Sequence, residues 1–222
     1  MWTIWNIGTP WTVLAALIFA VLLSAPLSRA AYLLPRTLDD RIPNEPPTAH
    51  RRYRVVFFIA GALLGGTCVW RFGATPAAAV SIVFVTTLLA LAWIDAETGY
   101  LPDLLTLPLL WLGLLVNLQH TFSPLPDAVV GAVAGYLALW CLCGAFLLLT
   151  GRRGMGNGDF KLLAALGAWL GWSALPTIVL AASLLALCGA LISRLLGRLK
   201  AGEPFSYGPY LAVAGIVALL RL

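Results

Sequence analysis

The sequence predicts an all-α, polytopic bundle of transmembrane helices, and its composition and length indicate this fold class. Of the 222 residues, 61% are hydrophobic and only 10% are charged, and the mean hydropathy is +0.92. Soluble globular domains contain roughly 45–50% apolar and about 25% charged residues, so a water-soluble domain of this composition could not cover its surface. At about 20 residues per crossing, the chain is long enough for several spans.

Eight apolar stretches predict the individual helices. They cover approximately residues 10–32, 55–71, 76–94, 104–119, 127–150, 160–172, 174–193 and 206–221. The sixth is short for a full crossing and Pro176 interrupts the run after it, so six or seven spans are alternatives to eight. The apolar residues 1–23 carry no basic segment and no nearby cleavage signal, so we expect a retained first span rather than a signal peptide.

The distribution of basic residues predicts the orientation. If the polar segment 35–54 faces the cytoplasm, alternate loops place 12 of the 14 Lys and Arg residues on that side, with only Arg71 and Arg221 opposite. Basic residues favour cytoplasmic loops, so the N-terminus is expected outside. Removing one crossing would move the basic residues after the seventh stretch to the wrong side, which favours eight spans. The net charge of +5 therefore indicates membrane orientation rather than nucleic-acid binding.

Two acidic residues at the inner ends of spans are the candidate catalytic residues. Asp95 follows the third apolar stretch and Asp159 precedes the sixth, so two crossings separate them and both are expected at the same face. An ionisable residue bordering a span is costly unless it is solvated or paired, which makes it a functional hypothesis. Two neighbouring carboxylates share a proton, so one can activate water while the other polarises a peptide carbonyl.

Several residues near these aspartates are candidate supporting residues. Gly154, Gly156 and Gly158 precede the second aspartate. They would either permit positive φ and close approach of a peptide substrate, or form only a flexible turn. Asp103 is interpreted as the N-cap of the fourth helix, with membership of the site as the alternative. Lys161 would either lower the pKa of a carboxylate or contact lipid phosphate.

The sequence disfavours other hydrolytic chemistries. The two histidines, His50 and His120, fall on opposite predicted faces, and no H-E-x-x-H motif indicates a zinc metalloprotease. No G-x-S-x-G motif indicates a serine hydrolase. The cysteines lie in apolar runs without a C-x-x-C pair and are predicted to be small core hydrophobes. They are Cys68, Cys141, Cys143 and Cys188.

Three motifs resemble those of one known family. Residues 93–103, WIDAETGYLPD, are similar to the first signature of the type IV prepilin peptidases. Residues 154–162, GMGNGDFKL, resemble their G-x-G-D signature, and residues 207–211, YGPYL, resemble their closing G-P-[FY]-L segment. In isolation, Gly208 and Pro209 of this last segment predict only the start of a helix.

The resemblance implies a membrane-embedded aspartic endopeptidase of the bacterial inner membrane. It would cut the leader from type IV prepilins or pseudopilins at the cytoplasmic face, just after a glycine. Asp95 and Asp159 match the family's catalytic aspartates, Asp103 matches a recurring non-catalytic position, and Gly156 and Gly158 match the signature glycines.

The resemblance also predicts the domains, cofactors and partners. Residues 1–75 would carry the first spans and the short loop 35–54, and residues 76–222 would form a six-span peptidase core. Larger members bind zinc through two C-x-x-C pairs and methylate the product with S-adenosylmethionine. The corresponding stretch here, residues 26–54, contains no cysteine. Neither zinc, nor S-adenosylmethionine, nor methylation is therefore expected. The expected partners are prepilin substrates and the lipid bilayer, and not nucleic acid.

Two other functions are alternatives to a peptidase. A proton-coupled transporter or channel could use the same carboxylates. Transport sites tend to lie near the membrane midplane, however, whereas these carboxylates are expected at one face. A catalytically silent component of a pilus or secretion machine is the other alternative.

Overall fold

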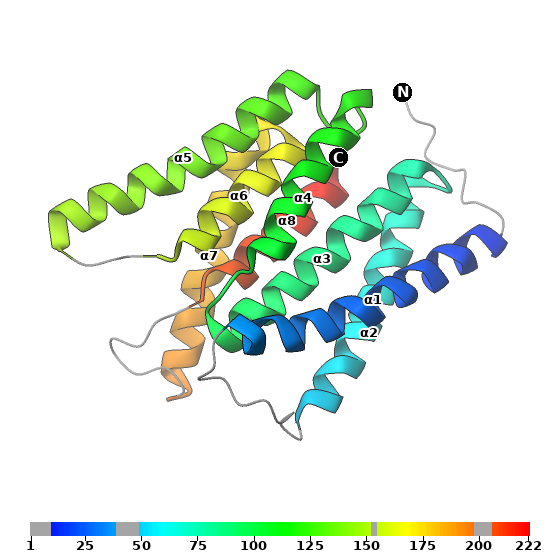
Figure 1. Cartoon of the computed structure of the whole chain (residues 1–222), viewed down its shortest axis with the longest axis horizontal. Helices are drawn as coiled ribbons and strands as arrows, with labels where there is room; N and C mark the ends of the chain where they lie inside the picture. The colour runs from blue at the N-terminus through cyan, green and yellow to red at the C-terminus, as the bar shows by residue number, and fades with distance from the viewer. Residues whose placement is uncertain (1–9, 39–48, 152–154, 198–205) are drawn as a thin grey trace. The chain divides into compact units, whose positions relative to one another are not determined.

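The structure, a computed structural model, describes residues 10–38, 49–151, 155–197 and 206–222, and every regular element in these ranges is helical (Figure 1). Eight α-helices follow one another in the order of the predicted stretches. They are α1 (Pro10–Leu38), α2 (Ala49–Phe72), α3 (Pro76–Thr98), α4 (Asp103–Val116), α5 (Leu125–Thr150), α6 (Asn157–Leu170), α7 (Leu175–Leu195) and α8 (Gly208–Arg221). Short 3₁₀ turns, η1 (Asn117–Gln119) and η2 (Trp172–Ala174), follow α4 and α6.

Helix length and hydropathy confirm a multi-pass membrane protein. Among the described residues, five helices are long and apolar enough to cross a bilayer: α1, α2, α3, α5 and α7. The other three, α4, α6 and α8, contain 14 residues each. At 1.5 Å per residue these reach about 21 Å, less than the roughly 30 Å of a hydrocarbon core. The number of spans and their orientation therefore stay predictions.

The helices form two compact units, Met1–Ala90 and Leu91–Leu222, and α3 contributes to both. In the first unit, α1 and α2 approach closely at small residues. A Cβ atom on Gly65 would lie 2.7 Å from the Cβ atom of Ala20, and one on Gly61 would lie 2.5 Å from the Ser24 hydroxyl oxygen. Small residues allow membrane helices to pack at short distance. The predicted functional boundary after residue 75 stays a prediction.

In the second unit, α6 is the central helix and packs against α4, α5 and α8 (Figure 1). From Asp159 to Leu170, every residue except Lys161 is buried. The carboxyl end of α6 is held by Asn117, whose amide nitrogen donates to the carbonyl oxygens of Ala168 and Trp169, each at 2.9 Å. The helix that carries Asp159 in its first turn is therefore buried along most of its length and held at its carboxyl end.

Two expectations about the chain are corrected. α1 continues to Leu38 and α2 begins at Ala49, so both helices extend into the segment 35–54 that was predicted as a loop. Of the four cysteines, only Cys68 is buried, and Cys141 and Cys188 are exposed. The core assignment was wrong for these two because apolar residues of a membrane protein can face lipid as well as the core.

Candidate active site

Asp95 lies in the last turn of α3, and the end of the helix fixes its position. Gly99 adopts a left-handed conformation, with φ +67°, and its N–H donates to the Asp95 carbonyl oxygen at 2.8 Å. Only glycine adopts this conformation readily, and it commonly ends helices in this way. The Asp95 side chain is 5% exposed. A carboxylate this buried requires a hydrogen-bond donor.

Asp159 lies in the first turn of α6 and is 7% exposed. Its Oδ1 atom is buried and has no hydrogen-bond partner among the described residues. Burial, and then the negative charge of nearby Asp95, raise the pKa of the Asp159 carboxyl from 3.8 to about 7. The two carboxyl groups therefore interact, although 64 positions separate them in the sequence. At neutral pH, a carboxyl group with this pKa still holds a proton in much of the population.

A third segment, Ser206–Gly208, contacts Asp95. The N–H of Gly208 donates to Asp95 Oδ2 at 2.9 Å, and the Ser206 hydroxyl donates to the Asp95 carbonyl oxygen at 2.8 Å. A Cβ atom on Gly208 would lie 2.6 Å from Asp95 Oδ2, so the close approach requires glycine. Pro209 follows in the first turn of α8, which confirms the predicted helix start.

Tyr207 completes this cluster on the side of Asp159. Its hydroxyl lies 3.2 Å from the Ser183 hydroxyl and donates to the Val179 carbonyl oxygen at 3.4 Å. Both partners belong to α7, so the Tyr207 side chain contacts this helix. Burial raises the pKa of the Tyr207 hydroxyl, the Ser183 hydrogen bond lowers it, and the charge of Asp159 raises it. Residues 206–208 thus lie next to both aspartates.

Asp103 does not cap α4, which corrects the interpretation from the sequence. The N-cap position is Pro102, and no side-chain bond caps the helix. Asp103 instead pairs with Lys161, whose ammonium lies 2.6 and 2.7 Å from the two carboxylate oxygens. Both side chains are partly exposed, at 51% and 29%. An exposed pair of this kind contributes about 0–1 kcal/mol, so it joins α4 to α6 but adds little to the stability of the fold.

The signature glycines adopt ordinary backbone conformations. Gly156, at the N-cap of α6, has φ −77°, and Gly158 is not among the glycines with positive φ. Of the two alternatives from the sequence, the one that uses positive φ therefore does not hold for these two glycines. A Cβ atom on Gly158 would lie 2.7 Å from the Leu101 Cβ atom, so its absence allows the segment before α4 to pack against α6. Gly154 lies outside the described residues.

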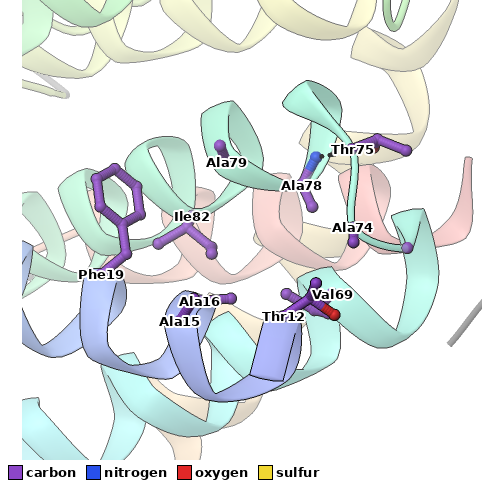
Figure 2. Close-up of a pocket in the computed structure, with 11 residues that line it drawn as sticks. Thr12, Ala15, Ala16, Phe19, Val69, Ala74, Thr75, Ala78, Ala79 and Ile82 are labelled. Atoms are coloured by element: carbon purple, nitrogen blue, oxygen red, sulfur yellow. Dashed lines mark hydrogen bonds between the residues drawn. The ribbon is translucent and has the colours of Figure 1, made fainter. Parts of the chain in front are cut away.

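The first unit contains a pocket of about 220 Å³ (Figure 2). Phe19 of α1 and Ala79 and Ile82 of α3 line it, and none of its lining residues is titratable. It offers no group for acid–base chemistry. Within the described ranges, no cluster of three or more His, Cys, Asp or Glu side chains could hold a metal ion.

Comparison with known proteins is decisive for the region that holds both aspartates. Residues 82–191 match the model of the type IV leader peptidase family. The chain therefore belongs to this family. The match includes Asp95 and Asp159 but ends before Ser206. No solved structure matches the chain.

Three relatives illustrate the similarity, and each is named a prepilin leader peptidase/N-methyltransferase. The protein of Neisseria gonorrhoeae is 48% identical over 164 residues, 74% of this chain and 56% of the relative. That of Burkholderia pseudomallei is 49% identical over 168 residues, 76% of this chain and 54% of the relative. That of Dickeya chrysanthemi is 60% identical over 131 residues, 59% of this chain and 46% of the relative. The chain spans about half the length of these relatives.

Sequence reasoning missed two members of the site, Ser206 and Tyr207. Tyr207 opens the family motif 207–211, and Ser206 directly precedes this motif. A signal was present, because a serine, a tyrosine and a glycine precede a proline at a predicted cytoplasmic end. The hydrogen bonds of Ser206 and Gly208 with Asp95 cross 111 and 113 positions of the chain, and spacing alone cannot specify such contacts.

Proposed function

We propose that this protein is a membrane-embedded aspartic endopeptidase that removes the leader from type IV prepilins or pseudopilins. The observation that carries the proposal is the interaction of two buried carboxyl groups, Asp95 and Asp159, within the region that matches the type IV leader peptidase family. The names of the relatives favour peptide cleavage over proton-coupled transport with the same carboxylates.

The two carboxyl groups share one proton in the reactive state. The ionised group takes a proton from a water molecule whose oxygen attacks the scissile carbonyl carbon, and the protonated group gives its proton to the carbonyl oxygen. In the second step, one hydroxyl proton of the tetrahedral intermediate returns to the second carboxylate. The carbon–nitrogen bond breaks, and the leaving amine takes its proton from the first carboxyl group. Both groups are then back in their starting states.

The substrate would enter from the cytoplasmic face of the bacterial inner membrane, and the cut would fall after a glycine. In this proposal, Asp103 and Lys161 hold the start of α6 through their ion pair, and Gly158 allows α6 to pack beside Leu101. Gly208 and Pro209 form the start of α8 beside Asp95. Gly154 and Gly156 would leave room for an extended peptide.

The test is cleavage of a co-expressed prepilin by three variants. Asp95→Asn and Asp159→Asn keep the shape of each side chain but remove the acid–base group, so each should lower cleavage by at least about 10²-fold. Glu97→Gln, an exposed change two positions from Asp95 on the same helix, is the matched control and should keep full activity. Membrane levels of all variants are compared by immunoblot. Normal cleavage by either asparagine variant would end the proposal.

Mass spectrometry of the processed prepilin answers the remaining questions about the product. We expect a new N-terminus directly after a glycine, and no added methyl group. A zinc chelator should leave cleavage unchanged, and so should the omission of S-adenosylmethionine. A methylated product, or loss of cleavage on chelation, would contradict the expectation that neither cofactor is used.

A further inference from the structure

The first amide of α8 lies against a buried carboxylate of another helix. The N–H groups in the first turn of a helix lack partners within the helix and carry partial positive charge. In α8 the N-cap residue, Tyr207, makes no side-chain cap bond, and Pro209 has no N–H group. The Gly208 N–H instead donates to Asp95 Oδ2 at 2.9 Å. Charge-assisted bonds of this kind favour the ionised carboxylate.

A second hydrogen bond holds this amide in place. The Ser206 hydroxyl donates to the Asp95 carbonyl oxygen at 2.8 Å, so the segment before α8 is tied to both the side chain and the backbone of one residue. The missing Cβ atom of Gly208 is what permits the approach, since a Cβ atom there would lie 2.6 Å from Oδ2.

The second aspartate has different surroundings. Asp159 Oδ1 is buried without a hydrogen-bond partner among the described residues, whereas Asp95 Oδ2 has the amide of Gly208. The titratable group next to Asp95 is Asp159, at the start of α6. Tyr207, beside Gly208, and Cys143 of α5 are the titratable groups close enough to Asp159 to interact with its charge. Glu97, on the same helix as Asp95, is exposed, and Lys161 is paired with Asp103. The amide of Gly208 is therefore a hydrogen-bond donor that Asp95 Oδ2 has and Asp159 Oδ1 lacks.

We propose that Ser206 and Gly208 are positioning residues that fix Asp95 as the ionised, water-activating member of the pair and leave the shared proton on Asp159. The inference rests on the proposed peptidase activity. The competing explanation is that Asp95 simply caps α8 and has no preferred role in the reaction. The two explanations differ in the pH dependence of catalysis, because a purely structural cap does not decide which carboxyl group is ionised during turnover.

The principal variant is Gly208→Ala, whose methyl group would push the amide away from Asp95. We expect kcat for prepilin cleavage to fall about 10- to 100-fold, with the acidic limb of the kcat profile moved to higher pH, because the anion loses its donor. The KM should change less than kcat. Gly144→Ala is the matched control, since a Cβ atom at Gly144 of α5 meets no atom within 4 Å. It should leave the profile unchanged.

Ser206→Ala is the second variant, and it provides the test if Gly208→Ala does not fold. It should lower kcat about 3- to 10-fold and move the profile in the same direction, and Ser206→Thr should restore both. Ser81→Ala, which removes a hydroxyl bonded to Ala77 of its own helix at 2.7 Å, is the control. A lower Tm with an unchanged profile, or wild-type kinetics in Ser206→Ala, would overturn the inference. Failure of the peptidase proposal itself is distinct, since wild-type protein would then not cleave prepilin.

Discussion

Asp95 and Asp159 are chemically identical and nearly equally buried, but their hydrogen-bond partners differ. Asp95 accepts a hydrogen bond from the start of a helix, while the buried Oδ1 of Asp159 has no partner in the described part of the chain. Burial without a donor favours the protonated form of a carboxyl group. The raised pKa of Asp159 is therefore a consequence of its position in the fold. Because this position holds a proton that the unfolded chain would lose, the same residue affects both cleavage and stability.

Asp159→Asn should abolish cleavage and also stabilise the protein, increasingly so at higher pH. The unfolded chain loses this proton near pH 3.8 and the folded protein near pH 7, so folding binds a proton between these values. The wild-type protein therefore loses stability as pH rises, and the asparagine variant does not. At about 1.4 kcal/mol per pKa unit, the difference reaches at most about 4 kcal/mol above pH 7. Thermal unfolding in detergent at pH 5, 6.5 and 8 measures it.

Glu97→Gln, an exposed change on α3, is the control and should leave the pH dependence of the melting temperature as in the wild type. A stability difference between Asp159→Asn and the wild type that is the same at all three pH values would contradict the pKa of Asp159.

Residue identity in the site was predictable from the sequence, but residue contacts were not. Asp95 and Asp159 could be singled out because carboxylates are rare at the ends of apolar stretches. Asp103 was assigned to a cap because an N-cap and the next position differ by one residue, less than the error of a predicted helix boundary. Its pairing with Lys161 depends on how α4 and α6 lie together, and no local pattern contains that information.

At the scale of elements, α5 and α6 are joined by a contact between backbones. A Cβ atom on Gly131 would lie 2.5 Å from the Gly167 carbonyl oxygen, and one on Gly167 would meet the carbonyl oxygen of Gly131. Backbone atoms cannot rotate away as a side chain can. The two glycines therefore set the distance between the helices, and with it the position of the helix that carries Asp159.

Gly167→Ala should destabilise the protein by about 2 kcal/mol or more, because the helices must separate to admit the methyl group. Gly144→Ala, in open space on α5, should be neutral or stabilise by up to about 1 kcal/mol, since alanine favours helix over glycine. Thermal unfolding of both variants in the same detergent gives the comparison. Equal melting temperatures for the two variants would show that the α5–α6 contact is not as tight as the structure has it.

The order and approximate bounds of all eight helices were predictable, because long apolar runs interrupted by Pro, Gly and charged residues leave few alternatives. What the runs could not specify is which helix lies at the centre. α6 is the most buried helix of its unit, yet it is among the shortest, and hydropathy does not distinguish a helix covered by protein from one covered by lipid.

For the whole molecule, basic residues and helix lengths predict how the chain crosses the membrane. The position of the proposed site at the cytoplasmic face depends on the basic residues, 12 of 14 of which fall on one predicted side. It also requires that α4, α6 and α8 each cross the bilayer, although each contains only 14 residues. Short helices can cross where neighbouring helices cover them or where the bilayer thins.

Cysteine labelling of spheroplasts from a bacterial host tests the orientation and the crossing of α4. In a variant without the four native cysteines, Ala74→Cys and Thr121→Cys should react with a membrane-impermeant maleimide added from outside. Tyr100→Cys and Met155→Cys should react only after permeabilisation. The reason is that Ala74 and Thr121 precede odd-numbered helices, whereas Tyr100 and Met155 precede even-numbered ones. Labelling of Tyr100→Cys and Thr121→Cys from the same side would show that α4 does not cross. A reversed pattern at all four positions would place the aspartates at the outer face. This result would contradict the orientation that the basic residues predict.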